Sequence, residues 1–454
     1  MSLLLVGLLA CRSGTDPAPP AADDTSTPTV PGDALVRFDG EPPKNVLMIS
    51  IDTFRRDHVG RFGDLGLSPF LDQLMDEGVV AERHQQCSNW TWHSTSCTLM
   101  GRAPETIGHM PRLDPGTRVP IPDGQTTLAT VLADNGFATV LLSPNMWLGP
   151  EWGNAQGYQV INPQGGNSAA ALLDRGSLLV DDAMADAGAD RWFLHVHLME
   201  PHAPYVPPTE FRVGEDELPP LPISIDQQGA HYDAIALWPD LSDEDRDLLA
   251  AHLGVRYRGE VRWMDHMLAQ VWELLEERGV LDDTLVVFWT DHGEAFWEHG
   301  VQTHAHFLFG EENDALLWFW AKGLEPASWT EPTHGTDMLP TVLDALQLTS
   351  PVELPGYPLG AAPQQRTLHA STYTRQGVLQ TASAGDWRLH YRWEDGQVRL
   401  YDRSTDPLER TDLLLEDPTH PEAPPLWEAM GERTELIDPL VEGFTPFPSI
   451  LDNR

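Results

Sequence analysis

The stretch that decides the fold is Asn45-Val46-Leu47-Met48-Ile49-Ser50-Ile51-Asp52, an apolar run that ends on a carboxylate. Because the run does not alternate with polar residues, it predicts a strand that is buried on both faces of a sheet. Ligands of open α/β sheets bind beyond the carboxyl ends of the strands, where Asp52 would lie. An aspartate in this position is more often a turn residue or a helix cap, so Asp52 alone does not define a site.

Strands and helices are expected to alternate on either side of this stretch. Apolar runs predict strands over 138–142, 192–198, 284–289 and 316–320, and helical patterns occupy 68–77, 127–134, 169–185 and 340–346. A longer helical pattern covers 242–279, and Gly254 and Gly259 are expected to divide it into two helices. The alternation predicts the α/β class, with a doubly wound, mostly parallel sheet flanked by helices.

The pattern changes after about residue 360. Short strand-like runs at 377–383, 387–393 and 398–401 are separated by Gly385-Asp386 and Asp395-Gly396, which favour hairpin turns. Three parts are therefore expected: a signal and tether over 1–35, a catalytic α/β domain over 36–360, and an α+β subdomain with a small antiparallel sheet over 361–454.

The chain is strongly acidic. Its 454 residues include 28 Lys and Arg against 69 Asp and Glu, a formal net charge of −41. Nucleic acid is excluded as a partner, because phosphate backbones are bound by clustered cationic side chains. Lysine occurs only as Lys44 and Lys322. An anionic substrate would therefore be bound by arginine, histidine, backbone amides or a metal ion.

The N-terminus is interpreted as an export signal. The apolar run over 3–9 is too short to span a bilayer, and Leu8-Leu9-Ala10-Cys11 resembles a bacterial lipobox. By that resemblance Cys11 would carry a lipid and anchor the protein in the cell envelope, in the periplasm or at the outer surface. Residues 14–33 would form the tether, and this anchor would be the protein's only contact with a membrane. No Lys or Arg precedes the apolar run, so an ordinary signal peptide is the alternative.

Export would place the chain in an oxidising compartment. Cys87 and Cys97 could then form a disulfide, or they could remain two buried thiols, because sequence does not fix the distance between them. A disulfide would stiffen the segment between the two cysteines.

Polar residues gather at the ends of three predicted strands. Asp52 follows the first strand, His197 and His202 lie at the end of the run over 192–198, and Asp291-His292 follows the run over 284–289. Carboxylates and imidazoles collected from separate strands suit one divalent cation, such as calcium, manganese or zinc.

Taken together, these residues resemble the sulfatase family of the alkaline phosphatase superfamily. The resembling blocks are 45–60, Pro201-His202-Ala203-Pro204-Tyr205, Thr290-Asp291-His292-Gly293-Glu294, 298–300, Asp337-Met338-Leu339-Pro340-Thr341 and 400–409. The resemblance covers most of residues 45–415. It implies an alkaline phosphatase-like α/β fold, a divalent cation and hydrolysis of sulfate or phosphate esters.

The nucleophile loop departs from the family pattern. Formylglycine sulfatases have Cys-x-Pro-Ser-Arg followed by Leu-Thr-Gly, and alignment on Leu99-Met100-Gly101 puts Thr91 at the nucleophile position and Ser94 on the family serine. His93 and Thr95 replace the proline and the arginine. Threonine is not converted to formylglycine, so no formylglycine is expected. The loop resembles that of threonine-nucleophile phosphodiesterases, which favours phosphoester chemistry.

The resemblance also implies roles for single residues. The metal ligands would be Asp52, Thr91, Asp291 and His292. His202 and His304 would contact the substrate or protonate the leaving group, because an imidazole titrates near neutral pH. His334 and Trp92 are further candidates for substrate contact. The alternatives are hydrogen-bonded loop histidines and a core tryptophan.

Three functions stay open at this point. The first is an exported metal-dependent hydrolase that acts on a sulfate or phosphate ester of a small molecule, a glycan or a lipid headgroup. The second is a transferase of phosphoryl-linked headgroups in the cell envelope. The third is a non-catalytic lipoprotein with a sulfatase fold, which Thr53 and Thr95 favour because the family often has Asp and Arg there. The acidic segment over 214–240 is expected to border the pocket, and the oligomeric state is left open.

Overall fold

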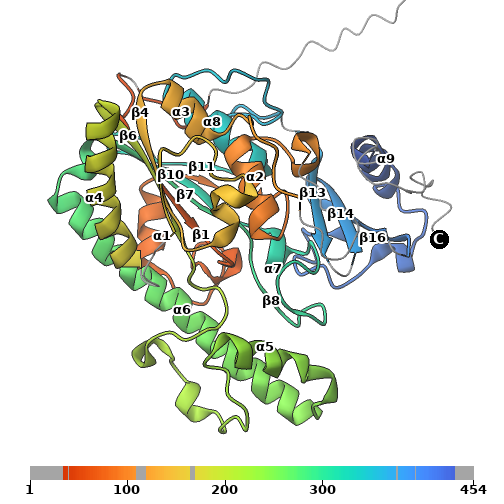
Figure 1. Cartoon of the computed structure of the whole chain (residues 1–454). Coiled ribbons are helices and arrows are strands. Elements are labelled where there is room, and N and C mark those ends of the chain that lie inside the picture. The colour runs from red at the N-terminus through yellow and green to blue at the C-terminus, as the bar shows by residue number, and fades with distance from the viewer. Residues whose placement is uncertain are drawn as a thin grey trace, which may run out of the picture.

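The computed structural model describes residues 34–38, 40–108, 119–163, 169–363, 365–374, 377–393 and 395–434. Figure 1 shows a central sheet with helices on both sides and a smaller sheet beside it. The predicted signal, its tether up to residue 33 and the lipidation site Cys11 lie outside the described residues. Within those ranges, no helix combines the length and the apolar character that a membrane span requires.

The central sheet is mostly parallel, as predicted. Its strands, in spatial order, are β11 (Ala327–Trp329), β2 (Val79–Ala81), β10 (Leu317–Trp320), β7 (Thr284–Thr290), β1 (Asn45–Ile51), β6 (Arg191–Leu198), β4 (Phe137–Leu142) and β5 (Val160–Asn162). Neighbouring strands run parallel except at β10, which is antiparallel to both β7 and β2. The short strands β2, β5 and β11 do not stand out as apolar runs in the sequence.

The central strand β1 is buried from both sides. Leu47, Ile49 and Ile51 belong to one apolar core, whereas Val46 and Met48 belong to the other. The first core includes side chains of α1 (Pro69–Asp76), α4 (Ala169–Ala187) and α6 (Asp243–Glu277), and the second includes side chains of α2 (Thr91–Met100), α3 (Leu128–Asp134) and α8 (Met338–Ala345). Two covered faces make the sheet doubly wound, as the unbroken apolar run of β1 predicts.

The long helix α6 corrects one prediction. It runs without a break through Gly254 and Gly259, which were expected to divide it. A Cβ atom on Gly259 would lie 2.7 Å from Cγ of Pro207 and 3.0 Å from the carbonyl oxygen of Phe211. The glycine therefore allows a loop to pack directly on the helix, and this packing offsets a helix-propensity cost of about 1 kcal/mol.

The C-terminal part forms the expected antiparallel sheet with one additional strand. Its strands are β13 (Leu368–Thr374), β14 (Gly377–Ala384), β15 (Trp387–Arg392) and β16 (Gln397–Asp402), and α9 (Ala423–Thr434) packs against them. Shorter elements complete the chain: β3 (His84–Gln85) with β12 (Thr333–His334), β8 (Ala295–Phe296) with β9 (Gln302–Thr303), α5 (Gln228–Ala236) and α7 (Gly310–Asn313).

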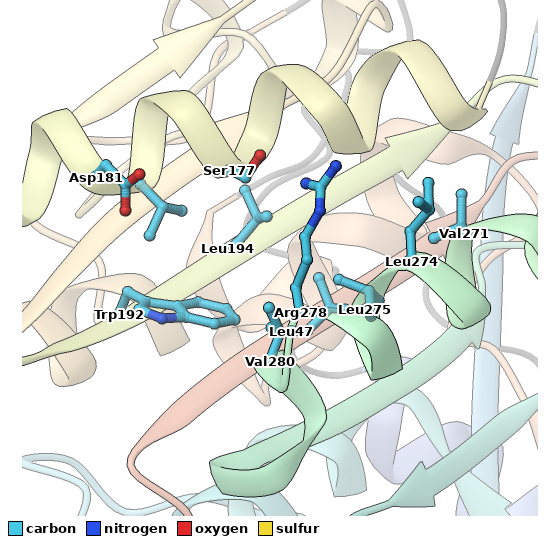
Figure 2. A pocket seen from close by; sticks show the side chains of 11 residues that line it. Leu47, Ser177, Asp181, Trp192, Leu194, Val271, Leu274, Leu275, Arg278 and Val280 are labelled. Carbon is cyan, nitrogen blue, oxygen red and sulfur yellow. The ribbon is translucent and has the colours of Figure 1, made fainter.

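An apolar cavity of about 130 Å³ lies between α4, α6 and the sheet. Figure 2 shows Leu47, Leu194, Val271 and Leu275 around it, with Ser177 on α4. None of the predicted site residues lines this cavity. This cavity is therefore separate from the polar residues that follow the strands.

Candidate metal and catalytic site

Three predicted ligands meet at the carboxyl edge of the central sheet. Asp52 follows β1 and Asp291 follows β7, and the parallel register pairs Ile51 with Thr290 just before them. Two neighbouring strands therefore place their two carboxylates side by side. Asp52, Asp291 and His292 are completely buried. We call these three residues the Asp52 cluster.

The atoms of the Asp52 cluster converge on one point. One ligand atom from each of the three side chains lies within 4.8 Å of the others. Nε2 of His292 is 3.6 Å from Oδ1 of Asp52 and 3.5 Å from Oδ2 of Asp291. Both oxygens are buried, and neither has a hydrogen-bond donor among the described residues. Nδ1 of His292 lies 2.9 Å from the carbonyl oxygen of Gly293, so it carries the proton and Nε2 presents a lone pair.

The electrostatics of the cluster favour a cation between these atoms. Burial alone would raise the pKa of Asp52, but the imidazoles of His202, His197 and His292 outweigh it and hold that pKa well below its usual range. Burial and then the charge of Asp52 raise the pKa of Asp291 well above its usual range. A divalent cation would allow both carboxylates to ionise, and the mixed oxygen and nitrogen donors fit calcium, manganese or zinc.

Thr91 lies next to the Asp52 cluster. It is the first residue of α2, and its Oγ1 is 3.2 Å from Nε2 of His292. One turn later, the hydroxyl of Ser94 donates to the carbonyl oxygen of Asp291, which fixes α2 against the end of β7. Backbone N–H groups at the start of a helix attract negative charge. The same helix therefore presents a hydroxyl and a favourable dipole to the cation site.

His304 and His202 complete the group of predicted catalytic residues. The ring of His304 lies 4.4 Å from that of His292 and 5.3 Å from that of His202, measured between centroids. Nδ1 of His304 donates to Oε1 of the buried Glu294 at 3.1 Å. Burial would lower the pKa of His304, but Glu294 outweighs it and the net pKa is raised. His304 and His202 are each half-buried, so a substrate can reach them.

Asn145 and Arg55 were not predicted as members of the site, whereas His197 was named among the polar residues at the strand ends. Asn145, which follows β4, donates from Nδ2 to Oδ2 of Asp52 at 2.7 Å, and Nε2 of His197 lies 3.5 Å from the same oxygen. Arg55 donates to the carbonyl oxygen of Glu294 at 2.9 Å. The rule that sites form at carboxyl edges points to Asn145, whereas the sequence carries no signal for the contact of Arg55.

Trp92 is not placed to contact a substrate, so that expectation is wrong. Its side chain is completely buried, stacks on Trp147 at 5.1 Å and donates from Nε1 to the carbonyl oxygen of Trp152. The alternative of a core tryptophan is correct. Trp90, which precedes Thr91 and meets Trp92 edge to face at 5.8 Å, is half-buried, as are Trp147 and Trp152.

His334 also lies away from the Asp52 cluster. It is 95% buried, and in the described part of the chain its Nδ1 contacts Thr336 and the sulfur of Cys87. Cys87 and Cys97 form a disulfide with Cα atoms 6.4 Å apart, which joins α2 to the segment before it. Direct substrate contact by His334 is therefore not supported, whereas the possible disulfide is present.

The sequence model of the Sulfatase family matches residues 44–348, which include the Asp52 cluster and Thr91. The chain belongs to this family. It is 26% identical to a choline-sulfatase of Rhizobium meliloti over 245 residues, which is 51% of this chain and 47% of the relative. It is 25% identical over 330 residues to the multifunctional alkaline phosphatase superfamily protein PehA of Trinickia caryophylli, which is 56% of this chain and 64% of the relative. The chain thus spans about half to two thirds of these relatives.

Solved structures share the fold of this sulfatase-family chain. A phosphonate monoester hydrolase of Agrobacterium radiobacter superposes with a TM-score of 0.64 at 17% identity, over 88% of this chain and 96% of the other. BT4656, in complex with its substrate D-glucosamine-2-N,6-O-disulfate, gives a TM-score of 0.66 at 14% identity. The match covers 90% of this chain and 100% of BT4656. The family and the fold expected from the sequence are therefore confirmed.

Proposed function

We propose that this sulfatase-family protein is an exported, metal-dependent hydrolase of sulfate or phosphate mono- or diesters, with Thr91 as the nucleophile. One observation carries the proposal: Oγ1 of Thr91 lies 3.2 Å from Nε2 of His292, beside the unpartnered carboxylate oxygens of Asp52 and Asp291. Family membership and the structural likeness to a phosphonate monoester hydrolase support ester hydrolysis.

The proposed reaction uses the residues in two steps. The cation bound by the Asp52 cluster would polarise the ester and stabilise negative charge on the oxygen of Thr91. Oγ1 of Thr91 loses its proton to solvent and forms a bond to phosphorus or sulfur, while the bond to the leaving oxygen breaks in line. Protonated His304 gives a proton to that leaving oxygen. Water then attacks the ester of Thr91, and the threonine oxygen regains a proton as the product leaves.

Phosphoester chemistry is the favoured branch of this proposal. A formylglycine hydrate has a second hydroxyl that expels sulfate by re-forming an aldehyde, whereas Thr91 has a single hydroxyl. A phosphorylated threonine needs no such route, because water can attack its phosphorus directly. The likeness to the multifunctional protein PehA and to a phosphonate monoester hydrolase supports this preference.

Mass spectrometry of the metal-loaded protein tests the nucleophile. The protein is mixed briefly with an aryl phosphodiester, an aryl phosphomonoester or an aryl sulfate, quenched, and analysed intact and as peptides. An adduct on Thr91 is expected, and a diester adduct that keeps its second ester group identifies phosphoryl transfer. Thr91→Ala is expected to lose the adduct and at least about 10³-fold in kcat/KM.

Thr95→Ala is the matched control, because Thr95 is a buried threonine one turn further along α2. It is expected to keep both the adduct and most of the activity. Elemental analysis gives a readout that does not depend on activity, with one divalent cation per chain expected. Bound cation with no adduct and no turnover would instead support the non-catalytic alternative.

The location and the substrate class are part of the same proposal. We propose a lipid anchor on Cys11 and an ester of a small molecule, glycan or lipid headgroup as substrate. The disulfated glucosamine bound by BT4656 is the substrate of that protein, and it supports a glycan ester as one choice here. Cys11→Ser is expected to move the protein from the membrane fraction to the soluble fraction; unchanged membrane association would contradict the anchor.

A further inference from the structure

We propose that a second, arginine-lined pocket binds an oxyanion, either a free sulfate or phosphate or an anionic group of a larger molecule. This pocket has a volume of about 160 Å³ and lies where the α/β part meets the C-terminal sheet. We call it the arginine pocket. None of its lining residues belongs to the Asp52 cluster, so it is a separate site and its anion binding does not depend on ester hydrolysis.

Three arginines from distant parts of the chain line the arginine pocket. Arg56 comes from the turn after β1, Arg83 precedes β3, and Arg403 follows β16. Their side chains are 20%, 36% and 18% exposed. They are therefore accessible to a small ion and also partly shielded from water, which strengthens charge-assisted hydrogen bonds. Guanidinium groups bind sulfate and phosphate through paired N–H donors.

The arginines keep donors that internal contacts do not use. Arg83 contacts the carbonyl oxygen of Gly385 and Oδ1 of Asp386 through Nη2 alone, each at 2.7 Å. Among the described residues, Nη1 and Nε of Arg83 therefore have no acceptor. Arg403 pairs with Asp314 through Nη2, while its buried Nε makes no hydrogen bond in the same part of the chain and lies 3.8 Å from Oε2 of Glu409.

The charges in the walls do not balance. The three arginines face two carboxylates that also line the pocket, Asp314 and Asp386. Asp314 is already shared, because it pairs with Arg56, Arg403 and the buried Arg388. Burial, together with the charges of Arg403 and Arg388, lowers the pKa of Arg56. For Arg403, burial is outweighed by Asp314, Glu409 and Asp386, which raise the pKa of that guanidinium. A bound anion would neutralise the excess of arginines over carboxylates in the walls, in a chain that is otherwise strongly acidic.

The oxyanion that the arginine pocket binds has two conceivable sources. The first is a free inorganic oxyanion, including the product of the proposed reaction. The second is an additional sulfate or phosphate group on the substrate, and this source rests on the proposed function. Trp387 also lines the pocket, and its indole face could pack against a sugar ring that carries such a group.

Calorimetry on the full-length Thr91→Ala protein, freed of metal by chelation, tests the binding itself. Sulfate and phosphate are titrated at constant ionic strength, with chloride as the reference ion. Arg83→Gln is expected to weaken sulfate binding at least about tenfold, since it removes a charged donor. Arg37→Gln is the matched control, because Arg37 is 53% exposed and pairs with Asp344 outside the pocket; a change below twofold is expected.

Equal affinities in the two variants, or no heat with either anion, would overturn the proposal. Kinetics on protein with intact Thr91 then separate the two sources. A raised KM for an aryl ester with a second anionic group, with an unchanged KM for the simple aryl ester, assigns the pocket to the substrate. Loss of inhibition by inorganic sulfate or phosphate assigns it to the free ion. If the protein has no turnover, the calorimetric result still decides whether the pocket binds an anion.

Discussion

Glu294 controls the protonation of His304 through one hydrogen bond of 3.1 Å. Its charge raises the pKa of His304 against the opposing effect of burial. A reaction that needs the imidazolium of His304 has its full rate at pH values below this pKa. The rate falls as the pH rises through the pKa. Glu294→Gln removes the charge and keeps the shape, so the alkaline decline of kcat/KM is expected to move to lower pH. The pH profiles of the two proteins provide the measurement.

Glu298→Gln serves as the control for this prediction. Glu298 lies four residues after Glu294 but pairs with Arg55 at 2.5 Å, whereas Nδ1 of His304 bonds to Glu294. Its pH profile is expected to match that of the wild type. An alkaline decline that stays in place in Glu294→Gln would mean that His304 does not donate the proton.

The two carboxylates of the Asp52 cluster predict how metal removal changes stability. Burial and the charge of Asp52 raise the pKa of Asp291 above its value in the unfolded chain. A carboxyl group whose pKa is higher in the folded chain than in the unfolded chain stabilises the fold at low pH. This stabilisation is lost as the pH rises through the pKa of the folded state. The metal-free protein is therefore expected to lose stability toward neutral pH. Asp291→Asn should remove that loss.

Calorimetric unfolding with and without chelator, across the pH range, measures this effect. Metal is expected to raise the melting temperature of the wild type but not of Asp291→Asn, whose metal affinity should fall at least about 100-fold. Without metal at neutral pH, Asp291→Asn should melt at or above the wild-type temperature. A clearly lower melting temperature there would show that the carboxylate itself stabilises the fold.

Sequence predicted the site residues that follow strands or stand in family motifs. Asp52 and Asp291 were candidates because polar residues gather at carboxyl edges, and the family resemblance named them as metal ligands. His197 lies inside a strand, where its contact with Asp52 depends on the packing of β1 against β6. Trp92 was placed wrongly, because the burial of an aromatic residue depends on which face of α2 packs against the tryptophans around it.

At the scale of single elements, β1 was predictable, whereas β10, which lies on the other side of β7, was predictable only in part. An unbroken apolar run indicates burial on both faces but carries no information about strand direction, so the antiparallel β10 could not be foreseen. The long α6 was misjudged because Gly259 looked like a break. Its helical conformation depends on contacts with Pro207 and Phe211, which the local sequence does not contain.

The two glycines of α6 give a matched pair of tests. A Cβ on Gly254 meets only the flexible end of Arg258, so Gly254→Ala is expected to stabilise the protein by about 0.5–1 kcal/mol through helix propensity. A Cβ on Gly259 would clash with Pro207, so Gly259→Ala is expected to destabilise it by about 1–3 kcal/mol. Urea unfolding of both variants measures the difference. Similar stability changes in the two would contradict this account of the packing.

At the scale of the whole molecule, one buried arginine joins the two sheets. Arg388 of β15 is completely buried, and it donates to Gln85, Asp314 and Glu409 at 3.1–3.2 Å. Gln85 and Asp314 belong to the α/β part, and they precede Arg388 by 303 and 74 positions. Pairing over such separations leaves no periodic signal, so the sequence predicted each sheet but not the connection between them.

Replacement of Arg388 tests whether this connection holds the C-terminal sheet in place. Arg388→Leu leaves the buried carboxylate of Glu409 with fewer partners, so a loss of about 3 kcal/mol in the free energy of unfolding is expected. Arg399→Leu is the matched control on neighbouring β16, because Arg399 is half-buried and hydrogen-bonds with Gln397 and Tyr401. Urea unfolding followed by tryptophan fluorescence should show an early step for Arg388→Leu, as the C-terminal sheet separates first, and a single later transition for Arg399→Leu. Coincident transitions in the two variants would mean that apolar packing, and not Arg388, joins the sheets.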